Sequence, residues 1–261
     1  MKSFELPNKI IWRRDNSQSL SETFYLSFYK DIQKRLGFFH DHFDFQFVKA
    51  NQENMKKYFL PLYEKEIMIR ADYLLNRETI VQEFLEKVAK SDAYRFLFIF
   101  HEGKVILATL FSLHDNGLFI GYRAVKRNVD NRLRHDATVA YWGEKLLFDY
   151  GNEQGVSFVS RGKDTHPFLG KSNIGRPLYK LKTGVKPKAP VMDKTLRFLQ
   201  VTEKDIMASG EPVLFFDAPN SEGFYQKSLL YYPEGLLAES YIKEFQKVFD
   251  WVGVSFTPVP Y

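Results

Sequence analysis

The chain has 261 residues, of which 44% are hydrophobic and 26% charged, and its formal net charge is +5. This composition is typical of a globular protein with one large domain, or with one domain and a smaller lobe. Cysteine is absent, so disulfides, thiolate zinc sites and cysteine nucleophiles are excluded. The modest positive charge suits an acidic ligand such as a coenzyme phosphate or RNA, and it fits a merely basic surface equally well.

Nothing in the sequence indicates export or membrane insertion. Residues 1–18 lack the apolar core of a secretory signal. The longest apolar runs, 96–100 and 105–111, are far shorter than the roughly 20 residues that a membrane span needs. We therefore expect a cytoplasmic protein.

The first predicted element is a helix at residues 19–36. Apolar side chains recur there at every fourth position, Ser19 and Glu22 form a capping box, and Gly37 follows where a helix commonly ends. Alternation of apolar and polar residues over 43–48 then predicts a strand.

Two helical segments come next. Asn51 can cap a helix, and Pro61 is expected to kink or divide it, because proline lacks a backbone donor and clashes with the preceding turn. Residues 77–90 carry one apolar face opposite pairs of Glu and Lys spaced four apart, which predicts a further helix.

Three apolar runs predict an antiparallel meander. The runs 94–100, 104–113 and 118–125 are joined by His101-Glu102-Gly103 and Asp115-Asn116-Gly117. Asn-Gly between apolar runs is a strong hairpin signal, because both residues tolerate positive φ.

The second half of the chain mixes loops, strands and helices. A basic loop at 126–135 leads to a predicted helix that ends before a glycine. The expected elements, in order, are a helix at 136–150 closed by Gly151, a strand at 156–160, a polar loop at 161–177, strands at 178–182, 195–201 and 212–217, a helix opened by Pro233, and a surface tail with Pro258 and Pro260.

The basic loop is a candidate anion site. It enters a helix N-terminus, where free backbone N–H groups and the helix dipole favour negative charge. Arginine forks suit phosphate, and the cations of this stretch are Arg123, Lys126, Arg127, Arg132 and Arg134. The alternative is a solvated basic loop in which Asp130 and Asp136 only cap the helix.

The order of these elements resembles the GNAT acyltransferase fold. It is most similar to the branch that holds the FemX/FemAB peptidyltransferases and the BioF2-like acetyltransferase domains. The matching segments are 59–66 for the first helix, 103–111 for the central strand, Gly121-Tyr122 with the basic loop and Trp142 for the cofactor strand and helix, and 179–184 for a late "F-K-x-G" strand. The resemblance covers about residues 40–186.

This resemblance implies an α/β (α+β) fold with a mixed, mainly antiparallel twisted sheet flanked by helices. The implied domains are an N-terminal helical segment at 1–42, a GNAT-like acyltransferase domain at 43–186 and a small C-terminal extension at 187–261. The implied reaction moves an acyl or aminoacyl group from a CoA-type or charged-tRNA donor to an amine or hydroxyl of a small-molecule or peptide acceptor. Acyl-CoA is thus the expected cofactor, and the oligomeric state stays open.

The resemblance also implies where the chemistry lies. The donor would bind in the splay between the fourth and fifth strands, its carbonyl held by a backbone N–H near Tyr122 to Ala124. The expected cofactor-binding residues are Tyr122, Arg123, Ala124, Arg127, Arg132, Leu133 and Arg134.

An acceptor amine must lose a proton, so a base is required. Asp164 and His166, which leave the end of the fifth strand, are the candidates, although a loop Asp and His can equally be turn chemistry. Tyr179 could protonate the leaving thiolate, or it could be a core aromatic. Arg161, Lys180 and Lys182 are the candidate substrate-binding residues. The two lysines would share one face of a strand.

A metal site is not expected. His40, His42 and Asp44 would share one face of a strand, but a stable zinc site needs three or four ligands, and no further histidine cluster is visible in the sequence.

Two other functions stay open. The glycine-rich phosphate loop of typical GNAT enzymes is absent, since residues 131–136 hold no glycine, which favours a binding module that has lost catalysis. A nucleic-acid-binding protein is the third reading, and it predicts binding that weakens steeply with salt.

Overall fold

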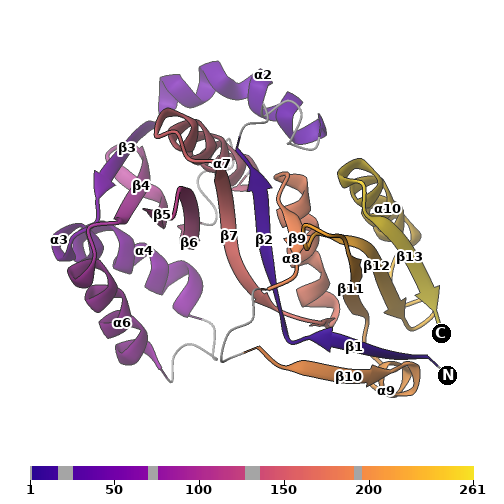
Figure 1. Cartoon of the computed structure of the whole chain (residues 1–261). Coiled ribbons are helices and arrows are strands. Elements are labelled where there is room, and N and C mark those ends of the chain that lie inside the picture. Colours follow the sequence, from indigo (N-terminus) through magenta and orange to yellow (C-terminus); the bar gives the residue numbers. More distant parts are fainter. Residues whose placement is uncertain (1, 17–25, 70–75, 127–135, 191–195) are drawn as a thin grey trace. The chain divides into compact units, whose positions relative to one another are not determined.

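The computed structural model describes residues 2–16, 26–69, 76–126, 136–190 and 196–261 (Figure 1). The described residues form two compact units. We call Met1–Arg14 with Ser160–Tyr261 the terminal unit, and the part that contains Leu26–Val159 the central unit. Within the described ranges, no helix combines the length and the apolar character needed to cross a bilayer.

The central unit contains four antiparallel strands that pair as neighbours in one sheet. They are β3 (Asp44–Lys49), β4 (Tyr94–His101), β5 (Lys104–His114) and β6 (Gly117–Val125), in that order. The predicted strand and meander are therefore confirmed.

The second hairpin turn differs in detail from the prediction. Its left-handed residues are Asp115 and Asn116, with φ of 48° and 56°, while Gly117 pairs with His114 as the first residue of β6. Short polar side chains tolerate this conformation because they hydrogen-bond locally, so Gly117 has another role, which is steric.

One face of this sheet is covered by two helical segments. The first runs without a break through α3 (Gln52–Asn54), a π-helical stretch at Met55–Phe59, α4 (Leu60–Tyr63) and a second π-helical stretch at Glu64–Met68. Asn51 caps it as predicted, accepting a 2.7 Å hydrogen bond from the amide of Asn54. Pro61 does not divide the segment. Instead, a wider π turn precedes and follows the turn that holds it.

The second covering helix is α6 (Arg77–Lys90), as predicted. Its Phe84 packs edge-on against Phe59 and Tyr63 of the first segment. The rings and aliphatic side chains of both segments bury the strand residues Phe96, Phe98 and Leu110 in one core.

Helices α2 (Leu26–His42) and α7 (Asp136–Glu153) also belong to the central unit. Phe39 of α2 stacks on Trp142 of α7, with ring centroids 4.9 Å apart. Gly143 of α7 lies so close to β5 that a Cβ there would be 3.0 Å from a methyl group of Leu107.

Both helices extend beyond their predicted C-terminal ends. Gly37 lies inside α2, where nothing approaches within 4 Å of a Cβ position, so it does not end the helix. His40 and His42 are consequently helical and cannot line a strand face with Asp44. α7 likewise continues past Gly151 to Glu153. The predicted capping pair Ser19–Glu22 lies outside the described residues.

The terminal unit is built from three groups of strands. β2 (Lys9–Asp15) lies between β7 (Phe158–Thr165) and β9 (Lys186–Lys188). β1 (Ser3–Pro7) pairs with β10 (Phe198–Thr202) in an antiparallel ribbon. The third group is a four-stranded sheet in the order β13 (Ser255–Pro260), β12 (Tyr225–Tyr232), β11 (Val213–Pro219) and β8 (Phe168–Leu169). Three helices complete it: α8 (Lys171–Lys182), α9 (Glu203–Ala208) and α10 (Glu239–Val252).

Several predictions for this unit were wrong. Residues 161–165 extend β7, and 171–182 form a helix, where a polar loop and a strand were expected. Three buried side chains at helical spacing, Ile174, Leu178 and Leu181, account for α8, because their shared face joins the core.

Two predictions for the C-terminal segment also fail. The last helix begins at Glu239 rather than at Pro233. The tail is no surface wrap, because β13 pairs in parallel with β12 over Ser255–Pro260.

Candidate functional site

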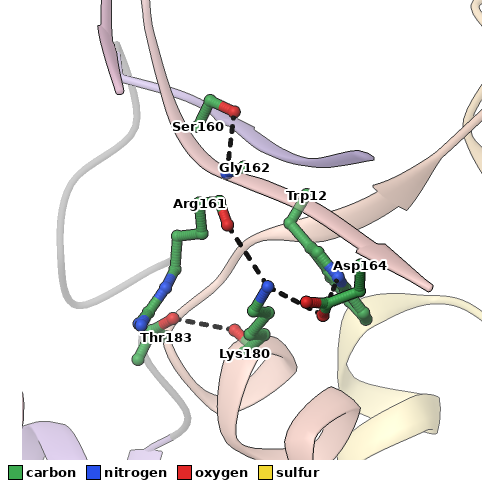
Figure 2. Close-up of polar contacts among 7 residues, drawn as sticks. All are labelled: Trp12, Ser160, Arg161, Gly162, Asp164, Lys180 and Thr183. Atoms are coloured by element: carbon green, nitrogen blue, oxygen red, sulfur yellow. Dashed lines mark hydrogen bonds and ion pairs between the residues drawn. The ribbon is translucent and has the colours of Figure 1, made fainter. Parts of the chain in front are cut away.

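A largely buried lysine is the centre of the candidate site in the terminal unit (Figure 2). Lys180 projects from α8, and its Nζ donates to Asp164 Oδ2 at 2.8 Å and to the backbone oxygen of Arg161 at 3.2 Å. The side chains of Lys180 and Asp164 are only 13% and 17% exposed. The pair is thus largely shielded from water, where a charged hydrogen bond is stronger than on the surface.

The backbone of β7 brings two of these partners to the same side. Gly162 has φ of 72°, and its amide donates to the Ser160 hydroxyl at 3.3 Å. In a regular strand, residues 161 and 164 would face opposite sides. The left-handed glycine breaks that alternation, so both Arg161 and Asp164 reach α8.

Trp12 of β2 completes the site from a distant part of the sequence. Its side chain is fully buried, and its indole N–H donates to the same oxygen of Asp164, also at 2.8 Å. The Lys180 ammonium lies 5.4 Å from the centre of the indole ring, within the range of a cation–π interaction. Figure 2 shows Asp164 between the tryptophan and the lysine.

Burial changes the acid–base behaviour of Lys180. The pKa of Lys180 is lowered from 10.5 to about 8. Desolvation is the main cause, and the cations Arg161 and Arg176 add to it, while the Asp164 carboxylate opposes it. The group is therefore mostly protonated at pH 7, and a substantial neutral fraction appears slightly above neutrality.

Tyr179 lies beside this cluster, whereas Lys182 has its partner elsewhere in the terminal unit. The Arg161 guanidinium lies over the Tyr179 ring, 4.8 Å from its centre. Lys182 forms an ion pair with Glu244 of α10. Because Lys180 and Lys182 belong to a helix, they are rotated by roughly 200° relative to each other and do not share a face, contrary to the prediction.

His166 is held inside the core of the terminal unit. It is fully buried, its Nδ1 is 2.8 Å from the Pro7 oxygen, and its Nε2 accepts from the Phe216 amide at 3.0 Å. Burial lowers its pKa to about 4. Backbone groups thus occupy both ring nitrogens of His166.

Of the predicted cofactor-binding residues, those that the structure describes lie in the central unit. The Tyr122 hydroxyl accepts from Lys87 at 2.9 Å, and Ala124 is fully buried. Arg123 donates to Thr109 at 2.9 Å and pairs with the buried Glu144 of α7. The Arg123 guanidinium therefore has hydrogen-bond and ion-pair partners inside the fold. Arg127, Arg132, Leu133 and Arg134 lie outside the described residues.

A β-bulge interrupts β6 beside these residues. Leu110 pairs with Tyr122 and Phe111 with Ile120, so Gly121 is the extra residue. A Cβ on Gly121 would lie 3.3 Å from the Leu110 oxygen. Bulges of this kind redirect backbone and side-chain groups and are frequent next to active sites.

No metal centre is formed by the described part of the chain, where no three His, Asp or Glu side chains lie close enough to share an ion.

Trp12 and Arg176 are the two members of the site that sequence reasoning missed. The alternation Ile10, Trp12, Arg14 indicates a strand, but no local signal identifies Asp164 as the partner of Trp12.

These observations define a mixed α/β protein whose mainly antiparallel sheets are flanked by helices. The sequence matches no protein-family model and no curated protein. Among solved structures, FemX is similar, with a TM-score of 0.51 and 10% identity over 68% of this chain and 59% of FemX. The chain thus has the GNAT-like fold of the FemX type, which confirms the predicted fold class.

Two further structures are similar at lower scores. A conserved protein of unknown function from Bacteroides thetaiotaomicron matches with a TM-score of 0.46 and 10% identity over 76% of this chain and 61% of its own. A GCN5-related N-acetyltransferase from Sphaerobacter thermophilus matches with a TM-score of 0.41 and 11% identity over 76% of this chain and 51% of its own. The chain spans about three fifths of the length of FemX and of the Bacteroides protein.

Proposed function

We propose that this protein is an acyltransferase that moves an acyl or aminoacyl group from a CoA-type thioester or a charged-tRNA ester to an amine or hydroxyl acceptor. The observation that carries the proposal is the buried ammonium group of Lys180, held by Asp164 and the Arg161 oxygen in a FemX-like fold. The β-bulge at Gly121 supports it, because bulges of this kind are frequent next to active sites.

Lys180 is suited to stabilise an oxyanion. An ammonium group has three hydrogens, and within the described part of the chain it meets two acceptors, so one hydrogen is left for a substrate oxygen. A hydrogen bond to the carbonyl oxygen of the donor would strengthen as that oxygen becomes negative in the tetrahedral transition state. Partial burial increases this effect, because water screens the charge less.

The proton balance of the reaction assigns a role to Asp164. The acceptor attacks the carbonyl carbon and forms a C–N or C–O bond, and the broken C–S or C–O bond leaves its electron pair on the donor's sulfur or oxygen. Both hydrogen bonds that described residues give to Asp164 end on Oδ2, so Oδ1 can accept the proton that the acceptor loses. The leaving group takes up that proton in the end, and Tyr179, next to Lys180 on α8, is our candidate for delivering it.

A ligand screen followed by one substitution tests this function. Thermal unfolding is measured with free CoA, acetyl-CoA, longer acyl-CoAs and an aminoacyl-tRNA, since a donor that binds only the folded protein stabilises it by about 2.7 kcal/mol at a hundredfold excess over its Kd. The donor that stabilises the protein is then offered with amine and hydroxyl acceptors. We expect Lys180→Met to lose transfer and retain donor binding, while Lys243→Met, which removes an exposed lysine of α10, changes neither.

The outcomes separate the competing functions. Donor binding without transfer to any acceptor would favour the non-catalytic binding module, which the lack of glycine in 131–136 also favours. Binding of uncharged RNA that weakens steeply with salt, with no response to acyl donors, would favour the nucleic-acid-binding protein. Full transfer by Lys180→Met would refute the assigned role of the lysine.

A further inference from the structure

We infer that Trp12 is a positioning residue, which holds the Asp164 carboxylate against Lys180 and through it controls the charge of that lysine. The inference deepens the proposed function and rests on it for the part that Lys180 plays in transfer. The contact between the three side chains does not depend on that function, so it can be tested without any substrate.

The orientation of the indole is fixed by its surroundings. Trp12 is fully buried, and the ring of Phe216 meets it edge-on at 5.7 Å, while Phe168 packs against it at 6.4 Å. These rings come from β11 and β8, two strands of one sheet. Because close-packed rings cannot turn freely, the indole keeps one orientation, in which its N–H is directed at Asp164.

The Asp164 carboxylate, in contrast, depends on its donors for its position. It stands at the end of β7 and is partly accessible to water, with 17% of its side chain exposed. Its two donors, Trp12 and Lys180, meet the same oxygen from two different elements, each at 2.8 Å. If the indole donor is lost, the carboxylate can rotate toward solvent, where water replaces the missing hydrogen bond.

Such a rotation would act directly on Lys180, because Asp164 is the anion that supports its charge. Among the described residues, the charged and aromatic groups that act on Lys180 are Trp12 from β2, Arg161 and Asp164 from β7, and Arg176 from α8. Of these, Asp164 is the anion, and its carboxylate favours the protonated amine, whereas burial and the two arginine cations oppose it. Moving the carboxylate away therefore lowers the pKa of Lys180.

The test is an NMR titration of the Lys180 side chain, assigned through Lys180→Met, in four proteins: the parent chain, Trp12→Phe, Asp164→Asn and the double variant. Phenylalanine keeps a ring beside the ammonium and removes the indole N–H. We expect Asp164→Asn to lower the pKa of Lys180 by about one unit or more, as the loss of a close opposite charge does. Trp12→Phe should lower it in the same direction, and it should add nothing in the Asp164→Asn background.

Trp142→Phe is the matched control, since Trp142 is equally buried but belongs to the core of the central unit. It should cost stability without changing the Lys180 titration. If Trp12→Phe lowers only the melting temperature and leaves the Lys180 pKa unchanged, Trp12 is a core residue and the inference fails. An equal effect of Trp12→Phe with and without the Asp164 carboxylate also overturns it, because the indole would then act on Lys180 directly.

The titration and the donor screen fail independently. If the titrations show the expected coupling of Trp12, Asp164 and Lys180 but the protein binds no acyl donor, the proposed function is refuted and the positioning role stands. Acyl transfer by a protein in which Trp12→Phe leaves the titration unchanged refutes the positioning role alone.

Discussion

Gly117 lies directly beneath the ring of Phe158: a Cβ on this glycine would be 2.3 Å from Cζ of the phenylalanine. Both residues belong to the central unit, where Gly117 is the first residue of β6 and Phe158 is the first residue of β7. Glycine is required at this position by the close approach of the ring, since its own φ is not left-handed.

Gly117→Ala is therefore expected to destabilise the protein by roughly 1–3 kcal/mol, the usual cost of forcing extra volume into a packed site. Gly37→Ala is the opposite case. Gly37 lies inside α2 with open space around it, so alanine should stabilise by about 0.5–1 kcal/mol through its better helix propensity. Urea unfolding measures both. Equal stability of the two variants would show that the ring of Phe158 moves aside at little cost.

His166 should make the protein sensitive to mild acid. Its pKa is about 4 in the folded chain against an ordinary value of 6.5, so the unfolded chain binds more protons between these values. Stability from this residue is complete above pH 6.5 and is lost as the pH falls toward 4, by up to about 3 kcal/mol. The measurement is the difference in unfolding free energy between the parent and His166→Gln at several pH values. A difference that stays constant from pH 7 to pH 4 would contradict the assignment.

Lys180 should give a pH dependence on the alkaline side. Its pKa is about 8 in the folded chain against an ordinary value of 10.5, so the unfolded chain again holds more protons, here between pH 8 and 10.5. Below pH 8 the buried charge reduces stability, and that penalty disappears as the pH rises, by up to about 3 kcal/mol. The stability of the parent relative to Lys180→Met should increase from pH 7.5 to 10, as measured by urea unfolding at each pH. A decrease over this range would reverse the predicted sign.

The Arg123–Glu144 pair should contribute to folding rather than to ligand binding. Both side chains are largely buried, with Glu144 fully so. Removing one member of a buried pair leaves an uncompensated charge, so Glu144→Ala is expected to cost about 3–5 kcal/mol. The double variant Arg123→Met/Glu144→Leu should recover most of that loss, because apolar replacements remove both charges together. Denaturant unfolding of the single and double variants tests this, and failure of the second substitution to recover stability would count against it.

Local sequence rules predicted the central unit well. Hairpin turns at residues 102–103 and 115–116 and alternating strands specify their own neighbours, because antiparallel pairing across a short turn is a local interaction. The periodic helix at 77–90 was predictable for the same reason. The C-terminal ends of α2 and α7 were not predictable, since Gly37 and Gly151 look like helix ends but lie inside helices.

The candidate site was predicted only in part. The sequence indicated the site residues Arg161, Asp164 and Lys180. It predicted, however, that the first two lie in a polar loop and the third on a strand face. Gly175 and Pro177 argue locally against a helix, and the burial of Ile174, Leu178 and Leu181 overrides them. The helical form of α8 is what separates Lys180 from Lys182.

The amino-acid sequence by itself determined the antiparallel meander, the composition that excludes cysteine chemistry, and the residue types from which a site could be assembled. Tertiary structure alone decided which of them meet. Trp12 and Asp164 are 152 positions apart, and no local pattern can encode their contact. The acid–base character of Lys180 follows from that assembly, because folding removes water from around the amine and thereby lowers its pKa.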